Sequence, residues 1–301
     1  MKHYKNRRRQ FLEEWEQSDI SNDYIFSKVM AQPQLCLQLI KAALPQLKIK
    51  RVYVRSQDGL SANLDAKDIR LDISAYGEGG EMFDIEMQTI RPKYLMQRIL
   101  YYHSTMITER LYPRESYGEI PKTYVIFICL FDWYRLGNSF YEVNLVPNGV
   151  NELKFKDGFV SLILNPYGDM TGCSEELQDF FDLVAGRPAG RTDFVREVKY
   201  AVKLAKRRND WRDRYMLVKD WVQDRVDYAV EQNTIAVTDR VTAEVTDRVT
   251  TEVTATMQEK FAQQLIKKAI STEQDYESLR ADLIDFFDAD FADKMLAKYY
   301  K

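Results

Sequence analysis

The chain has 301 residues, 45% hydrophobic and 30% charged, with a formal net charge of −3. This composition can bury a sizeable core and excludes collagenous, low-complexity and wholly disordered proteins. Three widely spaced cysteines, none in a CxxC pair, argue against a disulfide framework or a zinc ribbon and favour a reducing compartment. Because the chain has only two histidines, any metal chemistry must rely on Asp and Glu and suit a hard cation.

Neither a signal peptide nor a membrane helix is expected. The first residues, MKHYKNRRRQFLEEWEQ, are charged where a signal peptide needs an apolar run. The longest apolar run, residues 124–131 (YVIFICLF), is too short to cross a bilayer and fits a strand buried on both faces. We therefore expect a cytoplasmic protein without a membrane partner.

The first 190 residues alternate between helical and strand patterns. Apolar periodicity and capping residues predict helices over 7–16, 23–44, 92–112 and 174–185. Period-two patterns predict strands near 51–55, 70–76, 82–89, 122–133, 140–146 and 159–164. This order predicts an α/β fold, a mixed sheet with helices packed on it.

After Gly190 the pattern is entirely helical, which predicts an all-α C-terminal extension. Residues 191–234 form a basic helical region and 235–257 hold two octads, TDRVTAEV and TDRVTTEV, with an apolar residue at every fourth position. A period of four overshoots the helical turn by about 40° each time, so a straight coiled-coil seam is not expected. The repeat pattern is typical of a solvated spacer helix or a partly disordered linker. Two short helices, near 272–288 and 290–300, end the last segment, 258–301.

Strand alternation gathers carboxylates on one face of the hairpin formed by 70–76 and 82–89. Asp72, Asp84, Glu86 and Gln88 share this face, and a five-residue loop at 77–81 places position 76 opposite 82 and Asp72 opposite Glu86. Like charges in that position destabilise a sheet unless something compensates, and a divalent cation would do so. The alternative is an ordinary exposed hairpin face on which Arg70 pairs with the acids.

This stretch resembles the D…ExK core of the PD-(D/E)XK nucleases, in the variant ending in IEMQ. The variant is typical of the Rpn recombination-promoting nucleases, also described as PD-(D/E)XK nuclease family transposases. Four further stretches match the family's pattern, and the resemblance runs over about residues 20–230: DYIFSK at 23–28, KDIRLDI at 67–73, RILYY at 98–102 and WRDRYM at 211–216. The resemblance implies a restriction-endonuclease-like mixed sheet flanked by helices, here spanning 1–190.

The resemblance also implies a metal site. Asp72 and Glu86 would bind Mg²⁺ or Mn²⁺, and the backbone carbonyl of Met87 would complete the protein ligands. Gln88 stands where most of these nucleases have lysine, so it can orient water by hydrogen bonds but carries no charge. Asp23 is either a further acid or a helix-start charge, and Ser27 departs from the lysine usual in that stretch.

Two sets of residues are candidates for DNA contact. Arg91, Tyr94, Arg98 and Tyr101 would share one face of the helix predicted over 92–112, where guanidinium groups can hold phosphates and tyrosines can lie against bases. Lys206, Arg207 and Arg208 belong to the run 196–214, which has eight basic residues against three acidic ones. In both places a solvated or half-buried helix face is the alternative.

The leading hypothesis is therefore a Mg²⁺-dependent DNA endonuclease that promotes recombination or is related to transposases. We expect it to form a homo-oligomer through its C-terminal helical region. A second hypothesis is a catalytically weak or inactive DNA-binding or assembly protein that keeps the nuclease fold. A third is a regulatory interaction protein acting through the repeat helix.

Overall fold

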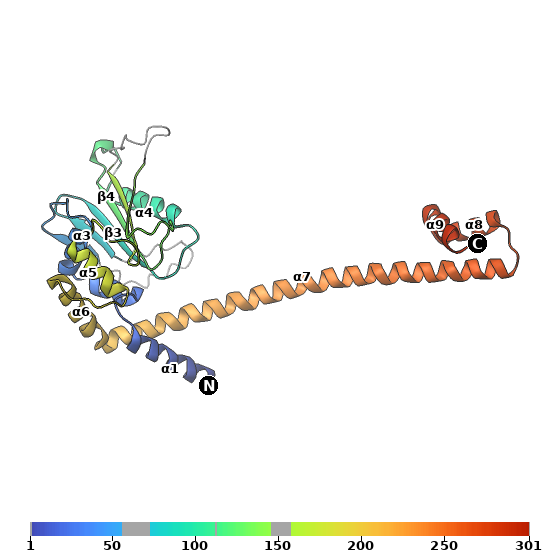
Figure 1. Cartoon of the computed structure of the whole chain (residues 1–301), viewed down its shortest axis with the longest axis horizontal. Helices are drawn as coiled ribbons and strands as arrows, with labels where there is room; N and C mark the ends of the chain where they lie inside the picture. The colour runs from blue at the N-terminus through green and yellow to red at the C-terminus, as the bar shows by residue number, and fades with distance from the viewer. Residues whose placement is uncertain (1, 56–72, 112, 146–157, 301) are drawn as a thin grey trace. The chain divides into compact units, whose positions relative to one another are not determined.

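A computed structural model describes residues 2–55, 73–111, 113–145 and 158–300 (Figure 1). Its contacts divide the chain into two compact units, Met1–Lys219 and Asp220–Lys301. The division predicted from the sequence, with boundaries at 190, 234 and 257, stays a prediction. Among the described residues, no helix is both long and apolar enough to cross a membrane.

The first unit begins with three helices, α1 (Lys2–Gln17), α2 (Asp23–Met30) and α3 (Pro33–Ala43). The prediction of a single helix over 23–44 is wrong. Proline has no backbone N–H and disfavours helical geometry in the residue before it, so Gln32 is extended and Pro33 opens a new helix. Asn22 caps α2 by accepting a hydrogen bond from the backbone N–H of Ile25.

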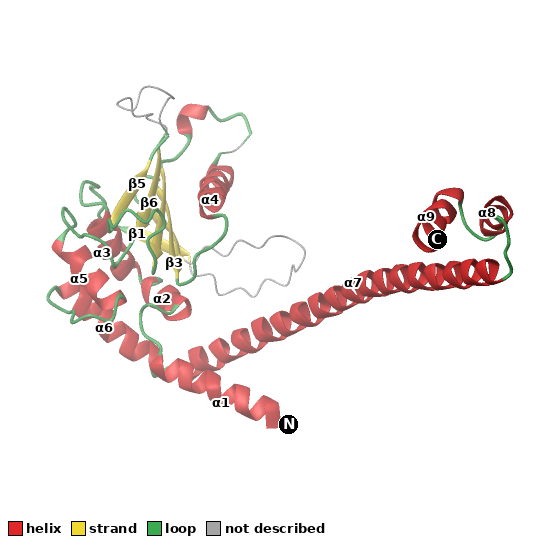
Figure 2. Ribbon diagram, turned by 45° about the vertical axis from the view of Figure 1, so that its right-hand side comes forward, coloured by secondary structure: helices red, strands yellow, loops and turns green. Residues whose placement is uncertain are grey.

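A six-stranded mixed sheet follows in the described part of the chain, which confirms the predicted fold class (Figure 2). Its spatial order is β1-β2-β3-β4-β6-β5; β3–β4 and β4–β6 are parallel and the other pairs antiparallel. The strands are β1 (Val52–Arg55), β2 (Ile73–Gly77), β3 (Met82–Gln88), β4 (Thr123–Cys129), β5 (Phe140–Val143) and β6 (Phe159–Leu164). Strand β3 therefore lies inside the sheet, between β2 and β4.

Helices cover both faces of the sheet (Figures 1 and 2). On one face α4 (Leu95–Arg110) packs Leu95, Ile99 and Met106 against β4 and β6, and the short 3₁₀ turn Tyr117–Glu119 follows it. On the other face lie α2, α3, α5 (Glu175–Val184) and α6 (Asp193–Lys206), which share one core cluster. Because both faces are covered, polar side chains on the central strands are buried.

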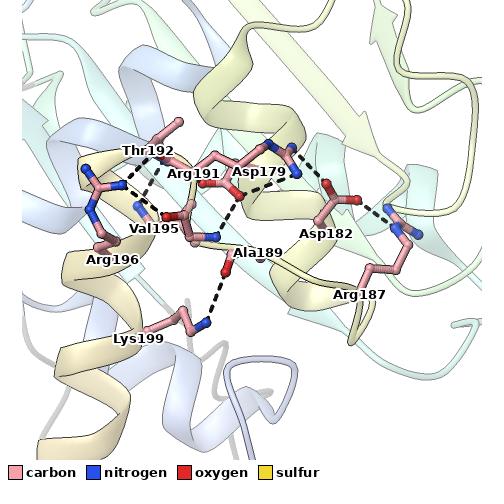
Figure 3. Close-up of polar contacts among 10 residues, drawn as sticks. Asp179, Asp182, Arg187, Ala189, Arg191, Thr192, Val195, Arg196 and Lys199 are labelled. Atoms are coloured by element: carbon pink, nitrogen blue, oxygen red, sulfur yellow. Dashed lines mark hydrogen bonds and ion pairs between the residues drawn. The ribbon is translucent and has the colours of Figure 1, made fainter.

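A buried carboxylate joins α5 to α6. Figure 3 shows Asp179 on α5 facing the connection to α6, where it accepts hydrogen bonds from the backbone N–H groups of Gly190 and Thr192, each at 2.8 Å, and from the Thr192 hydroxyl at 2.9 Å. Arg191 also pairs with Asp182 at 2.8 Å. These bonds fix the start of α6, whose residues Val195 and Val198 belong to the core of the first unit.

The C-terminal part of the chain is helical, as predicted. It contains α7 (Asn209–Ser271), α8 (Tyr276–Ile284) and α9 (Ala289–Tyr299). The octads lie within α7, and their valines are about half exposed, from 45% at Val245 to 48% at Val241. The end of α7 packs on α8 and α9 through a small cluster that includes Ile266, Leu283 and Met295.

Candidate active site

The acidic face of β3 is buried. Asp84 is 0% and Glu86 1% exposed, and Ser74, which pairs with Asp84 across the hairpin, is 5% exposed. An ordinary exposed hairpin face is therefore wrong for these residues, since α4 covers this side of the sheet. The register is the predicted one, with Tyr76 opposite Met82 and Ile73 opposite Ile85. Asp72 lies outside the described residues.

Arg98 of α4 reaches both Glu86 and Gln88. Its Nη2 lies 2.7 Å from Oε2 of Glu86, and its Nη1 donates to Oε1 of Gln88 at 3.0 Å. Gln88 in turn donates from Nε2 to Oε2 of Glu86 at 3.1 Å. Three side chains from one strand and one helix thus form a closed network around the carboxylate.

Tyr102, one turn after Arg98 on α4, completes this network. Its hydroxyl oxygen accepts from Arg98 Nη2 at 2.7 Å, and its ring stacks on Phe127 with centroids 5.9 Å apart. Burial, followed by the negative charge of Glu86, raises the pKa of Tyr102, so its hydroxyl stays protonated at neutral pH. The Arg98 guanidinium also lies 5.4 Å from the centroids of both rings, which holds it over the carboxylate.

The structure brings Glu86, Gln88 and Arg98 together, but Arg91 and Tyr101 do not join this network. Helix α4 begins at Leu95, so Arg91 precedes it and donates to the backbone carbonyls of Asp132 and Trp133. Tyr101 is 51% exposed.

The remaining candidates lie at helix ends. Asp23 is exposed in the first turn of α2 and accepts from the backbone N–H of Tyr24 at 2.7 Å, which fits a helix-start charge. Lys206 donates to the carbonyl of Glu16, Arg208 pairs with Asp210 at 2.7 Å, and Arg207 is exposed at the C-cap of α6.

Asp84 is the site residue to which the sequence pattern assigned no role. Asp84 precedes Glu86 by two residues, so strand alternation placed both on the same face. Only its complete burial under α4 shows that Asp84 is not an ordinary surface acid. Cys129, in the apolar run 124–131 that was predicted as a buried strand, is buried. Burial raises the pKa of its thiol to about 12, so it is not a nucleophile at neutral pH.

The carboxyl and amide oxygens of this site are the type of ligand that a hard divalent cation prefers. Within the described residues, however, no group of three or more His, Cys, Asp or Glu side chains is arranged to hold a metal. Asp84 and Glu86 are two buried carboxylates on one strand face, which is part of such a site. The further acid that the sequence predicts for this metal site is Asp72, which lies outside the described residues.

A mixed sheet flanked by helices, with carboxylates on a central strand, is the architecture expected of a PD-(D/E)XK nuclease domain. Residues 20–165 match the family model described as PD-(D/E)XK nuclease family transposase. The resemblance identified from the sequence is thereby confirmed. No curated protein and no solved structure matched the chain.

Proposed function

We propose that this protein is a divalent-metal-dependent DNA endonuclease that hydrolyses phosphodiester bonds, acting in the cytoplasm in DNA recombination or transposition. The observation that carries the proposal is the burial of Asp84 and Glu86 in a central strand of a nuclease-family domain. Buried carboxylates cost several kcal/mol of stability, and well-packed apolar residues of similar size are often at least as stable. Two such groups on one face point to a chemical role.

Asp72, Glu86 and the carbonyl of Met87 would hold Mg²⁺ or Mn²⁺. The bound ion would acidify a water molecule and stabilise the charge that develops on the phosphate. The chain's own contribution is to orient these ligands: Gln88 and Arg98 both bond Oε2 of Glu86, which fixes the direction of its carboxylate. Asp84 adds a second buried carboxyl group to the same strand face.

Arg98 offers a reason why Gln88 is tolerated at the lysine position. Its guanidinium lies within 3.0 Å of the Gln88 amide oxygen, so a permanent positive charge stands beside the neutral side chain. In our proposal Arg98 supplies, from α4, the charge that lysine supplies from the strand in most relatives. Gln88 then orients water or substrate through hydrogen bonds.

We also propose that DNA contacts extend beyond the carboxylates. Arg91 and Tyr101 would contact the strand near the site, and Lys206, Arg207 and Arg208 would add sequence-independent phosphate contacts. The C-terminal helical region would form a homo-oligomer.

A second candidate function is a DNA-binding or assembly protein that turns over weakly or not at all. It is favoured by Gln88 in place of lysine and by the engagement of Glu86 Oε2 with Arg98. Both functions require DNA binding, and only the first requires cleavage.

The test is nicking of supercoiled plasmid by the full-length protein with Mg²⁺ or Mn²⁺. The endonuclease proposal expects nicked and linear products that disappear with EDTA and in an Asp72→Asn variant. Binding without cleavage by the parent protein under all metal conditions would support the second function instead.

A further inference from the structure

The loop that follows β4 begins beside the candidate site. We call residues 131–138 the rim loop. The backbone N–H of Leu130 donates to the carbonyl of Gln88 at 2.9 Å, and Gln88 pairs with Cys129 in the parallel β3–β4 ladder. The rim loop therefore leaves the sheet at the carboxyl ends of two parallel strands, where open α/β sheets place their ligand sites.

One carboxylate accepts several hydrogen bonds from within the rim loop. Asp132 Oδ1 accepts from the backbone N–H of Tyr134 at 3.1 Å and of Arg135 at 2.9 Å, while Oδ2 accepts from Gly137 at 2.7 Å. Arg135 takes a positive φ of 57°, a conformation that non-glycine residues adopt at some cost. A loop ordered in advance loses little conformational entropy when it binds a ligand.

The rim loop also exposes apolar side chains, although the ring of Tyr134 packs on one side against Tyr141, with centroids 5.1 Å apart. Leu136 is 70% and Tyr134 38% exposed, and Ile90, two residues after β3, is 81% exposed. Single exposed apolar residues are ordinary, but these stand on the two segments that follow β3 and β4.

A positive charge is fixed against the same loop. The Arg91 guanidinium donates to the carbonyls of Asp132 and Trp133 and lies 4.8 Å from the centroid of a Trp133 ring. These carbonyl acceptors position the guanidinium without neutralising it, unlike the carboxylate that pairs with Arg98. Lys93 and Arg135 add positive charge nearby in the sequence, and the one acid of the rim loop, Asp132, directs its oxygens inward to loop donors.

We propose that the rim loop binds an unpaired stretch of DNA next to the cleavage site, with a base against Tyr134 and Leu136 and a phosphate at Arg91. Exposed apolar side chains on a loop that also holds a guanidinium fit a base and its phosphate, and a base offers its face only when it is unstacked. The preferred substrate is then single-stranded, frayed or bulged DNA, not intact duplex. This inference rests on the proposed nuclease function for its biological meaning.

The test measures binding in EDTA, so it does not depend on cleavage. Full-length protein is titrated against a labelled single strand and against the blunt duplex of the same sequence, followed by fluorescence anisotropy. We expect tighter binding of the single strand, and Tyr134→Ala should weaken it by about fivefold to a hundredfold while changing duplex affinity little. Tyr134→Phe should bind as the parent does, because stacking needs the ring and not the hydroxyl.

Tyr117→Ala is the matched control, since Tyr117 is 84% exposed in the same unit. Equal affinity for single strand and duplex, or an equal loss on both substrates in Tyr134→Ala, would overturn the inference while leaving the nuclease proposal intact. Single-strand preference in a protein that never cleaves would support the rim loop and defeat the nuclease proposal.

Discussion

Arg98 Nη2 lies 2.7 Å from Oε2 of Glu86, so a side chain that is one-third exposed holds a carboxylate that is almost completely buried. The sequence predicted that Glu86 lies opposite the carboxylate of Asp72. The structure shows that it has a cationic partner from another element. This pair decides how the site should respond to substitution.

Glu86→Gln should lower metal-dependent nicking by about a hundredfold or more, because it removes a charged ligand while keeping an oxygen acceptor for Arg98. Isothermal titration with Mg²⁺ should show a matching loss of affinity. Glu142→Gln, the same change at an exposed strand position, is the control and should nick normally. Parental nicking by Glu86→Gln would remove Glu86 from the site.

Arg98→Gln should separate metal affinity from turnover. Without the guanidinium, the Arg98 charge no longer competes with the metal for Glu86, so Mg²⁺ should bind several-fold more tightly although nicking slows. The metal-free variant should lose about 1–3 kcal/mol of unfolding free energy, and added Mg²⁺ should recover part of it.

Urea unfolding with and without Mg²⁺ checks the stability effect, and Arg110→Gln, at the exposed end of α4, is the matched control. Arg98→Lys should keep more nicking than Arg98→Gln because it keeps the charge. If the parent, Arg98→Gln and Arg98→Lys had the same metal affinity and the same nicking rate, Arg98 would have no role in the site.

Asp179→Asn should destabilise the first unit by about 2–4 kcal/mol, because a buried anion that accepts three hydrogen bonds becomes an amide with fewer acceptor sites. Asp193→Asn, whose parent side chain is 90% exposed, should change the unfolding free energy little.

The pH dependence of this effect has a defined sign. Burial by itself raises the pKa of Asp179, but the hydrogen bonds from Thr192 and Gly190 outweigh it, and the pKa is lowered. The stability contributed by Asp179 is therefore present above its ordinary value, about 4, and is lost as the pH falls through the lowered pKa. Urea titrations between pH 7 and pH 3 should show the gap between parent and Asp179→Asn closing at the acid end.

Arg207→Gln should reduce the salt dependence of DNA binding by about one unit of log–log slope, as expected for one lost phosphate contact. Arg208→Gln should change the slope less, because Arg208 is already paired with Asp210. Filter binding over a salt series measures both slopes, and equal effects of the two variants would argue against this assignment.

Deleting one octad, residues 246–253, should leave urea unfolding of the sheet unit and Mg²⁺ binding unchanged. The deletion removes two half-exposed valines, Val249 and Val253, and rotates the remaining C-terminal part of α7 by about 80° about the helix axis. We therefore expect sedimentation velocity to show altered self-association. Unchanged sedimentation would identify the repeat as a passive spacer.

The sequence alone determined the features that depend on local periodicity. Alternating residues and a five-residue turn predicted the register of β2 and β3, and β6 begins and ends where its pattern predicted. The IEMQ stretch at 85–88 and the upstream Asp72 pointed to the family, because these residues are either contiguous or separated by one short loop. The helix predicted over 23–44 failed because one proline outweighed an apolar stripe that continues across it.

Only the tertiary structure decided which residues meet Glu86. Helical spacing grouped Arg98 with Arg91 and Tyr101, but the packing of α4 on β4 turns Arg98 toward the carboxylate, and Arg91 joins the rim loop instead. The burial of Asp84 likewise depends on a helix that comes after it in the chain. Such contacts depend on how a helix lies on a sheet and which rotamers its side chains adopt, and neither is encoded in the spacing of residues along one element.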